Sequence, residues 1–472
     1  MEEHQKLPKV TIFPSLGIGH IIPLIEFSKF LVSHFNFSVS LFLPPTLHQP
    51  DQAHLSSLHN LPNSISYSFL PPLNPTQTHL PENQTLSSII SHTHIHSLSS
   101  IRAVLGSLTQ HSRVVALITD IFGSDLFDLA REFTIPPYLF FTSNVMCLLF
   151  AYHLPKLDKI VSCEYRDMPD PLALPGCVPI YGVDFPEASQ NRKNEAYKIL
   201  LHHTERYKLA EGIFVNSFIN LESDALRVFQ NEISDWPRVY PIGPIIQSGF
   251  GSDEYKWECL SWLDQQPIGS VLFVSFGSGG TLSYEQTIEL AIGLEKSGQS
   301  FLWVVRDPNN SVSGSFFGQC NDDESFIYLP EGYLDRIKGR GFLVPSWTPQ
   351  IKILSHKSIG GFVSHCGWNS ILESIVYGVP IIAWPLYAEQ KMNAVLLNEG
   401  LKVALRVKAN ENGVVEVDEI TRIVKDLIEG EEGNKAREKI KVLSELAKKA
   451  MGEDGDAMKT LSQVTKIWSA SI

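Results

Sequence analysis

The chain has 472 residues, which is too many for one ordinary hydrophobic core, so two domains are expected. Hydrophobic residues make up 43% of it and charged residues 19%, as in ordinary folded proteins. The net charge of −13, and the lack of a Lys/Arg cluster beside aromatic residues, argue against nucleic acid or an anionic membrane as a partner.

Three features bear on the compartment. The 6 cysteines are scattered without a CxxC pair, which argues against a zinc site or disulfide framework and favours a reducing, cytoplasmic compartment. The polar start MEEHQKLPK runs directly into a strand, so no secretory signal is expected. The most apolar long segment, Tyr138–Leu154, is interrupted by polar residues and is too short to span a bilayer. We therefore expect no membrane insertion.

The first elements predict a doubly wound α/β domain. Val10–Phe13 reads as a buried strand, Ile21–His34 as a helix and Ser38–Leu43 as the next strand, which together form a βαβ unit. The turn between strand and helix contains GxGH, but it lacks the third glycine of a dinucleotide fingerprint, with Ile22 in its place. An NAD site is therefore not expected.

His20 ends this turn, at the position where open α/β sheets bind their ligands. The adjacent helix start disfavours a second positive charge, so His20 is expected to stay neutral near pH 7 and able to accept a proton. These properties suit a general base.

Residues 44–100 are rich in Pro, Ser, His and Asn, and they predict long surface loops leading into a helix, Leu86–Leu105. Three histidines, His92, His94 and His96, follow one another at a spacing of two. On a helix this spacing scatters the side chains around the axis, so a shared metal site is not favoured.

Polar residues follow two further strands of the first domain. Val114–Thr119 ends at Asp120, whose carboxylate would face the same crevice as His20 if the sheet is parallel. Tyr138–Phe141 ends at Thr142. From the residues alone, Asp120 and Thr142 could equally be helix caps.

The predicted domain limits follow from composition. Residues 1–246 form the first domain, 247–257 a linker rich in Gly, Ser and charge, and 258–456 the second domain, with a terminal helix over 457–472. In the second domain the turn after the strand Val271–Phe276 lacks the lysine of a Walker P-loop, so NTP hydrolysis is not supported. Residues 308–326 read as a polar insertion.

Residues 347–390 hold the densest set of polar groups that a nucleotide sugar could use. The strand Gly360–Ser364 ends at His365, and Asn369 or Ser370 can cap the helix that follows. Converging N–H groups and the helix dipole make this turn an anion site suited to a diphosphate. Taken one at a time, His365 and the tryptophans of the block could be core residues.

Residues 347–390 resemble, over their whole length, the signature box of plant secondary-product UDP-glycosyltransferases, which are inverting enzymes of the GT-B fold. The resemblance implies two Rossmann-like domains facing across a cleft. It implies that Trp347 stacks on uracil, that Gln350 binds uracil or ribose, and that Glu373 holds the ribose hydroxyls. It implies that His365, Asn369 and Ser370 hold the phosphates and that Glu389 and Gln390 bind the sugar. Trp368 is a further donor-binding residue. Glu389 replaces the commoner Asp, and Thr348 the commoner Ala.

The resemblance extends to the rest of the chain, which is similar to the branch of hydroquinone glucosyltransferases. It implies that His20 and Asp120 form a catalytic dyad, that Ser278 lies on the phosphates and that Thr142 touches the sugar. It places Ile18, Phe122 and Phe150 around the acceptor, although these could equally be core residues.

The implied function is transfer of glucose from UDP-glucose to a small aromatic hydroxyl, such as a phenol, a phenylpropanoid or an indoxyl-like enol, by a monomer without cofactor or metal. The only DxD, Asp454–Asp456, lies on a glycine turn, where a cap is favoured over a manganese site. Two alternatives stay open: a catalytically inactive nucleotide-sugar-binding protein, and a glucosyltransferase acting on flavonoids or carboxylates.

Overall fold

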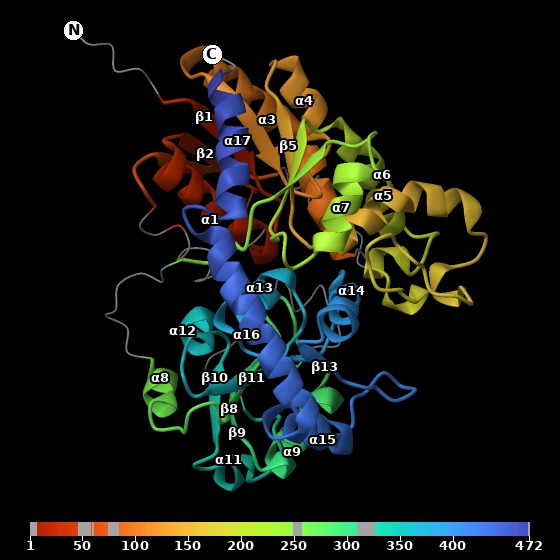
Figure 1. The fold of residues 1–472 in the computed structure, drawn as a ribbon, viewed down its shortest axis with the longest axis vertical. Coiled ribbons are helices and arrows are strands. Elements are labelled where there is room, and N and C mark those ends of the chain that lie inside the picture. The colour runs from red at the N-terminus through yellow and green to blue at the C-terminus, as the bar shows by residue number, and fades with distance from the viewer. Residues whose placement is uncertain are drawn as a thin grey trace. The chain divides into compact units, whose positions relative to one another are not determined.

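The computed structural model describes residues 7–45, 58, 61–73, 85–248, 257–308 and 326–470. The chain divides into two compact units. The first consists of Met1–Gly251 together with Lys449–Ile472, and the second of Ser252–Lys448. Each unit contains one parallel sheet with helices packed against it (Figure 1).

The first unit is built on a seven-stranded parallel sheet with the order β3-β2-β1-β4-β5-β6-β7. Its strands are β1 Lys9–Phe13, β2 Ser38–Leu43, β3 Ile65–Phe69, β4 Val114–Thr119, β5 Pro137–Phe141, β6 Gly212–Val215 and β7 Arg238–Pro241. The central strands are buried along nearly their whole length, as expected for a parallel sheet covered on both faces. The strand order reverses between β1 and β4, which is where ligands bind in folds of this kind.

The helices of the first unit are α1 Ile18–Phe35, α3 Leu86–His111, α4 Leu126–Glu132, α5 Val145–Ile160, α6 Glu195–Arg206, α7 Ser223–Asn231 and α17 Asp456–Ala470. Asparagines cap two of them: the Asn144 side chain accepts the Cys147 N–H at 2.8 Å at the start of α5, and Asn194 does the same for α6. Trp468 of α17 lies buried against Phe37 and Tyr138, so the last helix is part of this core.

The second unit has a six-stranded parallel sheet with the order β10-β9-β8-β11-β12-β13. Its strands are β8 Val271–Ser275, β9 Ser300–Val305, β10 Gly341–Pro345, β11 Ile359–Ser364, β12 Ile381–Ala383 and β13 Ala404–Arg406. Its helices are α8 Glu258–Leu263, α9 Tyr284–Ser297, α11 Tyr333–Arg336, α12 Gln350–Leu354, α13 Trp368–Tyr377, α14 Gln390–Val395, α15 Val417–Ile428 and α16 Glu431–Met451, with a π-helical turn at Leu396–Leu401. This sheet reverses its order between β8 and β11.

The predicted class, two doubly wound α/β sheets, is confirmed, and several local predictions are wrong. The helix α13 begins at Trp368 with Gly367 in the N-cap position, so neither Asn369 nor Ser370 is its cap. The first helix begins at Ile18 rather than Ile21, which places His20 inside its first turn.

Several elements do not follow from the sequence prediction. The strand β3 lies inside the segment predicted as loops, because four of its five residues are exposed and show no apolar run. The strand β13, at the edge of its sheet, has three residues, and α6 was not predicted. Most of the predicted linker 247–257 and of the predicted insertion 308–326 lies outside the described residues, and the domain limits stay a prediction.

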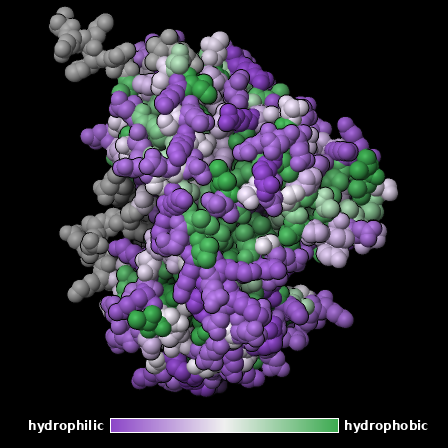
Figure 2. All heavy atoms as spheres, in the orientation of Figure 1, coloured by the Kyte–Doolittle hydropathy of each residue, from purple (hydrophilic) through white to green (hydrophobic). Residues whose placement is uncertain are grey.

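Polar side chains cover most of the face seen in Figure 2, and apolar ones gather over the segment around α5. This segment includes the exposed Ile160. Within the part of the chain that the structure describes, no helix is both long and apolar enough to cross a membrane. The five described cysteines are all free thiols.

Candidate active site

The order of the first sheet brings two loops together. The strands β1 and β4 are parallel neighbours, with Phe13 paired to Thr119 at their carboxyl ends. The loop after β1 carries Ser15 and leads into α1 with His20, and the loop after β4 begins with Asp120. His20 and Asp120, the members of the predicted dyad, therefore lie on neighbouring loops.

Asp120 is completely buried and accepts hydrogen bonds on both carboxylate oxygens. Its Oδ2 accepts the Ser15 N–H at 2.7 Å and lies 3.2 Å from His20 Nδ1. Its Oδ1 accepts the Ser15 hydroxyl and, at 3.2 Å, the Phe122 N–H. Burial raises the pKa of this carboxyl, but the interactions with His20, His94 and Ser15 lower it more, so that the pKa falls from 3.8 to about 2. Asp120 is therefore ionised at neutral pH.

The turn after Asp120 depends on a glycine. A Cβ on Gly123 would lie 1.8 Å from the Thr119 hydroxyl oxygen, so no larger residue fits without a shift. The Thr119 hydroxyl itself donates to the Phe13 carbonyl at 2.8 Å, which ties the ends of β4 and β1 together. The absence of a side chain at Gly123 thus lets the turn after Asp120 pack directly against Thr119 at the end of β4.

His20 faces Asp120 with one nitrogen. Since Asp120 is ionised and can only accept, the Nδ1 of His20 carries the proton in this pair, and the lone pair of a neutral ring is on Nε2. The side chain is 17% exposed, so the ring is not sealed in the core. A partly accessible imidazole with its lone pair on Nε2 can accept a proton from a bound hydroxyl.

The predicted acceptor residues differ in their surroundings. The ring of Phe122 lies beside that of His20, with 5.5 Å between centroids. Phe150 of α5 is fully buried, and its ring lies 4.9 Å from that of Phe185. Ile18 is half-buried at the first residue of α1, and Thr142 is half-buried directly after β5.

Polar contacts beyond the predicted set surround the dyad. His94, from α3, lies with Nε2 2.8 Å from the Ser15 hydroxyl oxygen. Among the described residues, one group of metal-ligand type is found, Asp125 with His202 and His203. Arg206 also ion-pairs with Asp125 at 3.3 Å. The guanidinium group therefore already neutralises the carboxylate that a metal ion would need. The three spacing-two histidines do not come together: His92 contacts Glu195 and stacks on His96 with 6.2 Å between ring centroids, whereas His94 is directed to Ser15.

The second sheet presents a similar pair of loops. Ser275 at the end of β8 is paired with Ser364 at the end of β11, so the Gly277 turn and the His365 turn are neighbours. Gly277 has a φ of 74°, and a Cβ there would lie 2.5 Å from the His365 ring. Burial lowers the pKa of His365 to about 4, so this imidazole is neutral at physiological pH.

The helix α13 starts directly after the His365 turn and carries four of the predicted donor-binding residues, Trp368, Asn369, Ser370 and Glu373. The Gln350 amide, from the start of α12, donates to the Ser370 hydroxyl at 2.9 Å and to Glu373 Oε2 at 2.6 Å. Trp347 is half-buried, with its ring 5.5 Å from that of Trp257. The structure thus joins Gln350, Ser370 and Glu373 in one hydrogen-bonded group. Trp368 is buried, and Asn369 is half-buried beside it at the first turn of the helix.

The end of the block is organised by Gln390 and by a residue that the prediction missed. The side-chain oxygen of Gln390 accepts the N–H groups of Leu386 and Tyr387 at 2.9 and 3.0 Å, which fixes the loop after β12. Asn393 donates to the Cys366 carbonyl at 2.9 Å and to Glu389 Oε1 at 3.2 Å. Asn393 therefore links the predicted sugar-binding loop to the predicted phosphate turn.

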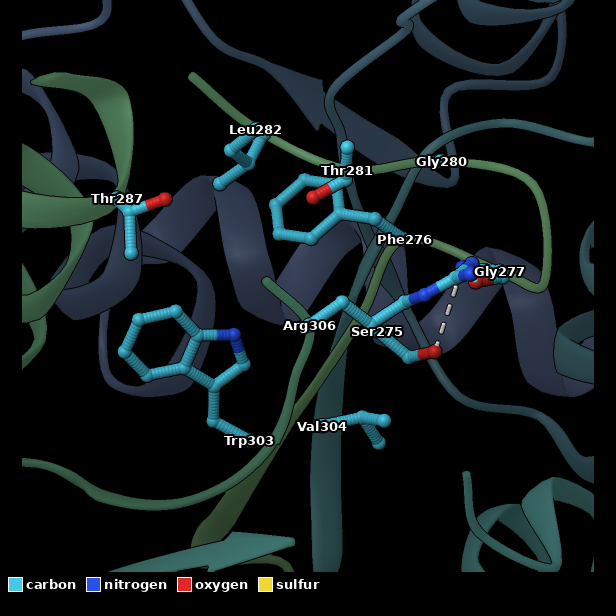
Figure 3. A pocket seen from close by; sticks show the side chains of 10 residues that line it. All are labelled: Ser275, Phe276, Gly277, Gly280, Thr281, Leu282, Thr287, Trp303, Val304 and Arg306. Atoms are coloured by element: carbon cyan, nitrogen blue, oxygen red, sulfur yellow. Dashed lines mark hydrogen bonds between the residues drawn. The ribbon is translucent and has the colours of Figure 1, made fainter. Parts of the chain in front are cut away.

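A hollow lies along the loop after β8 (Figure 3). Phe276, Leu282 and Trp303 provide apolar walls, and Arg306 extends from the end of β9 toward Gly277. The Arg306 guanidinium donates to the Gly277 carbonyl at 3.3 Å and to that of the exposed Ser278. Arg306 thus fixes the loop that carries the predicted phosphate contact.

Comparisons with known proteins identify the family of the chain. The family model "UDP-glucoronosyl and UDP-glucosyl transferase" matches residues 255–450. The hydroquinone glucosyltransferase of Rauvolfia serpentina is 51% identical over 466 residues, covering 98% of each chain. The chain belongs to the plant UDP-glycosyltransferases.

Solved structures of other plant UDP-glycosyltransferases have the same fold. Phytolacca americana UGT2, complexed with UDP-2fluoro-glucose and pterostilbene, is 58% identical with a TM-score of 0.90, over 98% of this chain and 99% of that one. A UDP-glucosyltransferase from Polygonum tinctorium, capable of glucosylating indoxyl, is 46% identical with a TM-score of 0.90 over the same shares. The protein is therefore a glycosyltransferase of the GT-B fold with a UDP-sugar as co-substrate.

Within this UDP-glycosyltransferase the sequence reading missed Ser15, His94, Arg306 and Asn393. Ser15 lies within the same turn as His20, so a polar residue there was a usable signal. The other three act through contacts between segments distant in sequence, and no spacing rule marks them.

Proposed function

We propose that the protein is an inverting O-glucosyltransferase that transfers glucose from UDP-glucose to the hydroxyl of a small planar aromatic and yields a β-glucoside. The observation that carries this proposal is the pair of His20 and the buried, ionised Asp120 at the point where the first sheet reverses its strand order. A nucleotide-sugar-binding protein without catalysis has no need for a base held in this way.

In the proposed reaction, His20 Nε2 takes the proton of the acceptor hydroxyl while Asp120 stabilises the imidazolium that forms. The acceptor oxygen forms a bond to the anomeric carbon. The bond from that carbon to the phosphate oxygen breaks, and UDP leaves with the electron pair. Attack from the face opposite UDP inverts the configuration.

The residues around α13 support a role in binding UDP-glucose. We assign the charge that develops on the leaving diphosphate to the N–H groups at the start of α13, with Ser278, His365, Asn369 and Ser370. Because His365 is neutral, it serves as a hydrogen-bond donor rather than as a fixed positive charge. Glu373, held by Gln350, is suited to the ribose hydroxyls, and Trp347 to the uracil face.

Four further residues are assigned to the binding of UDP-glucose. We assign Glu389 and Gln390 to the sugar hydroxyls, since the side-chain oxygen of Gln390 is occupied by backbone N–H groups and its amide nitrogen is left to donate. Thr142 is proposed to touch the sugar, and Trp368 to complete the donor set. The N–H groups at the start of α13, with Ser278, His365, Asn369 and Ser370, are proposed to stabilise the diphosphate charge without a metal ion, so activity is proposed to survive EDTA.

A phenolic acceptor is favoured by chemistry and by relatives. A phenolic hydroxyl, with a pKa of about 10, gives up its proton to an imidazole far more readily than an alcohol does. Phe122 beside His20 offers a flat apolar contact, and Ile18 and Phe150 are proposed as further walls. Relatives include a hydroquinone glucosyltransferase and a glucosyltransferase that glucosylates indoxyl.

The test is an acceptor panel with UDP-glucose: hydroquinone, coniferyl alcohol, indoxyl, a flavonol, a carboxylic acid and a sterol. We expect the highest kcat/KM with the small phenols, a β-glucoside by NMR, and near-complete loss of turnover in His20→Ala with UDP binding retained. A preference for the sterol or the carboxylic acid would refute the acceptor class. An α-glucoside would refute inversion.

We also propose a monomer located in the cytoplasm, with UDP-glucose preferred to UDP-galactose as donor. The scattered cysteines favour a reducing compartment. Sedimentation of the purified protein, imaging of a fluorescent fusion and donor competition test these three points.

A further inference from the structure

The dyad is connected to a second buried histidine that the proposed reaction does not use. His94 lies on α3 and is only 6% exposed. Its Nε2 lies 2.8 Å from the Ser15 hydroxyl oxygen. The same hydroxyl contacts Asp120 Oδ1. A continuous row of polar atoms therefore runs from α3 through the loop after β1 to the carboxylate beside His20.

The direction of the hydrogen bonds in this row follows from counting protons. A serine hydroxyl has one proton, and Asp120 is ionised, so the Ser15 proton points to Asp120. The lone pairs of the Ser15 oxygen then face His94, and a contact of 2.8 Å requires that His94 Nε2 carries a proton and donates it.

The protonation state of His94 follows from its surroundings. Burial lowers its pKa, as does the nearby His20, while Asp120 and Asp125 act in the opposite direction and are outweighed. The ring is therefore neutral and carries its proton on Nε2. Its Nδ1 has no hydrogen-bond partner among the described residues, which suits an unprotonated nitrogen better than a buried N–H donor.

We propose that His94 is a positioning residue for glucosyl transfer: it donates from Nε2 to Ser15, which directs the Ser15 hydroxyl to Asp120 and fixes the carboxylate that orients His20. This inference rests on the proposed role of the dyad. With the Ser15 hydroxyl free to rotate, Asp120 loses a directed donor on Oδ1, and the plane of its carboxylate toward His20 is less well defined.

Substitutions at His94 separate the donor from the bulk of the ring. Leucine fills a similar volume without a donor. Glutamine places an amide N–H close to the position of Nε2, whereas asparagine places one close to Nδ1 and does not reach Ser15. We expect His94→Leu and His94→Asn to lower kcat about 3- to 10-fold, the range of one ordinary hydrogen bond, with little change in either KM. His94→Gln is expected to recover most of the lost kcat.

Three further measurements exclude a merely structural effect. The control His92→Leu makes the same change two residues earlier on α3, where the side chain contacts Glu195, and is expected to keep the wild-type kcat. In a double-mutant cycle, His94→Leu should have no further effect on kcat once Ser15→Ala has removed the link. In ¹⁵N NMR of the wild type, the His94 ring should show a proton on Nε2 and none on Nδ1.

The outcomes separate the positioning role of His94 from the catalytic role of His20. Additive effects of Ser15→Ala and His94→Leu, an equal loss in His94→Gln and His94→Leu, or a proton on His94 Nδ1 would overturn the role of His94. A His20→Ala enzyme with substantial turnover would instead overturn the proposed function itself. If His94→Leu does not fold, the His94→Gln and His94→Asn pair and the NMR measurement still decide the question.

Discussion

The substitution Asp120→Asn tests the proposed mechanism most directly, because it keeps the shape of the side chain and removes the charge. Oδ2 accepts the Ser15 N–H and forms an ion-pair contact with His20 Nδ1 at 3.2 Å, and Oδ1 accepts the Ser15 hydroxyl and the Phe122 N–H. A carboxamide has only one acceptor oxygen, so one side must face N–H donors with an NH₂ group. If that side is Oδ2, the His20 proton moves to Nε2 and the base is lost.

The size of the loss can be worked out from Asp120 itself. Its environment lowers its pKa from 3.8 to about 2, which corresponds to a net preference of about 2.4 kcal/mol for the ionised form. Because the imidazolium forms only as the proton is taken up, losing this charge acts on the transition state rather than on binding. We therefore expect kcat to fall about 60-fold or more, but less than in His20→Ala.

The assay is the initial rate of UDP release with hydroquinone and UDP-glucose, with UDP affinity and melting temperature measured in parallel. Asp128→Asn is the matched control, since Asp128 is an exposed carboxylate that pairs with Arg206. A loss of kcat smaller than about 5-fold in correctly folded Asp120→Asn, with UDP binding intact, would show that His20 does not need the carboxylate and would refute the reasoning.

Two further predictions concern acid stability and donor binding. The pKa of Asp120 is depressed in the folded state, so its contribution of about 2 kcal/mol to the unfolding free energy is present above pH 3.8 and is lost as the pH falls toward 2. Denaturant unfolding of wild type and Asp120→Asn should therefore give stabilities that converge between about pH 5 and pH 2, and a constant difference would contradict this. Glu373→Ala should raise KM for UDP-glucose about 10- to 100-fold, the range of a hydrogen bond to a charged group, with the acceptor KM unchanged. The exposed Glu445→Ala in α16 is its control, and an unchanged donor KM would remove Glu373 from the donor site.

The fold was predictable from the sequence because its signals are local. Apolar runs such as that of β8, bounded by glycine turns, indicate buried parallel strands whatever their partners are. The strand β3 was missed for the same reason, since it lies at a sheet edge with mostly exposed side chains. The predicted first residue of a helix was wrong where no side chain caps the helix, as at Gly367 before α13.

The site was predictable only where the resemblance reached. His20, Asp120 and the block around α13 have recognisable spacings, whereas His94 acts from a helix 79 positions away from Ser15. Asn393 was missed in the same way, because the Cys366 carbonyl that it binds is 27 positions away. Every residue has a backbone carbonyl, so the sequence does not indicate which one is bound. Pairings of this kind are fixed by sheet order and packing, which a single sequence does not display.

The first unit is not a continuous piece of chain. Its core is completed by α17, whose Trp468 packs beside Phe37 and Tyr138, whereas the second unit comes from one uninterrupted segment. During synthesis the unit that contains the dyad therefore cannot complete its core until α17 has left the ribosome, while the other unit can fold earlier. A chimera that exchanges acceptor domains between relatives at a single crossover would pair one protein's sheet with another's final helix, so an exchange that keeps this core native needs two crossovers.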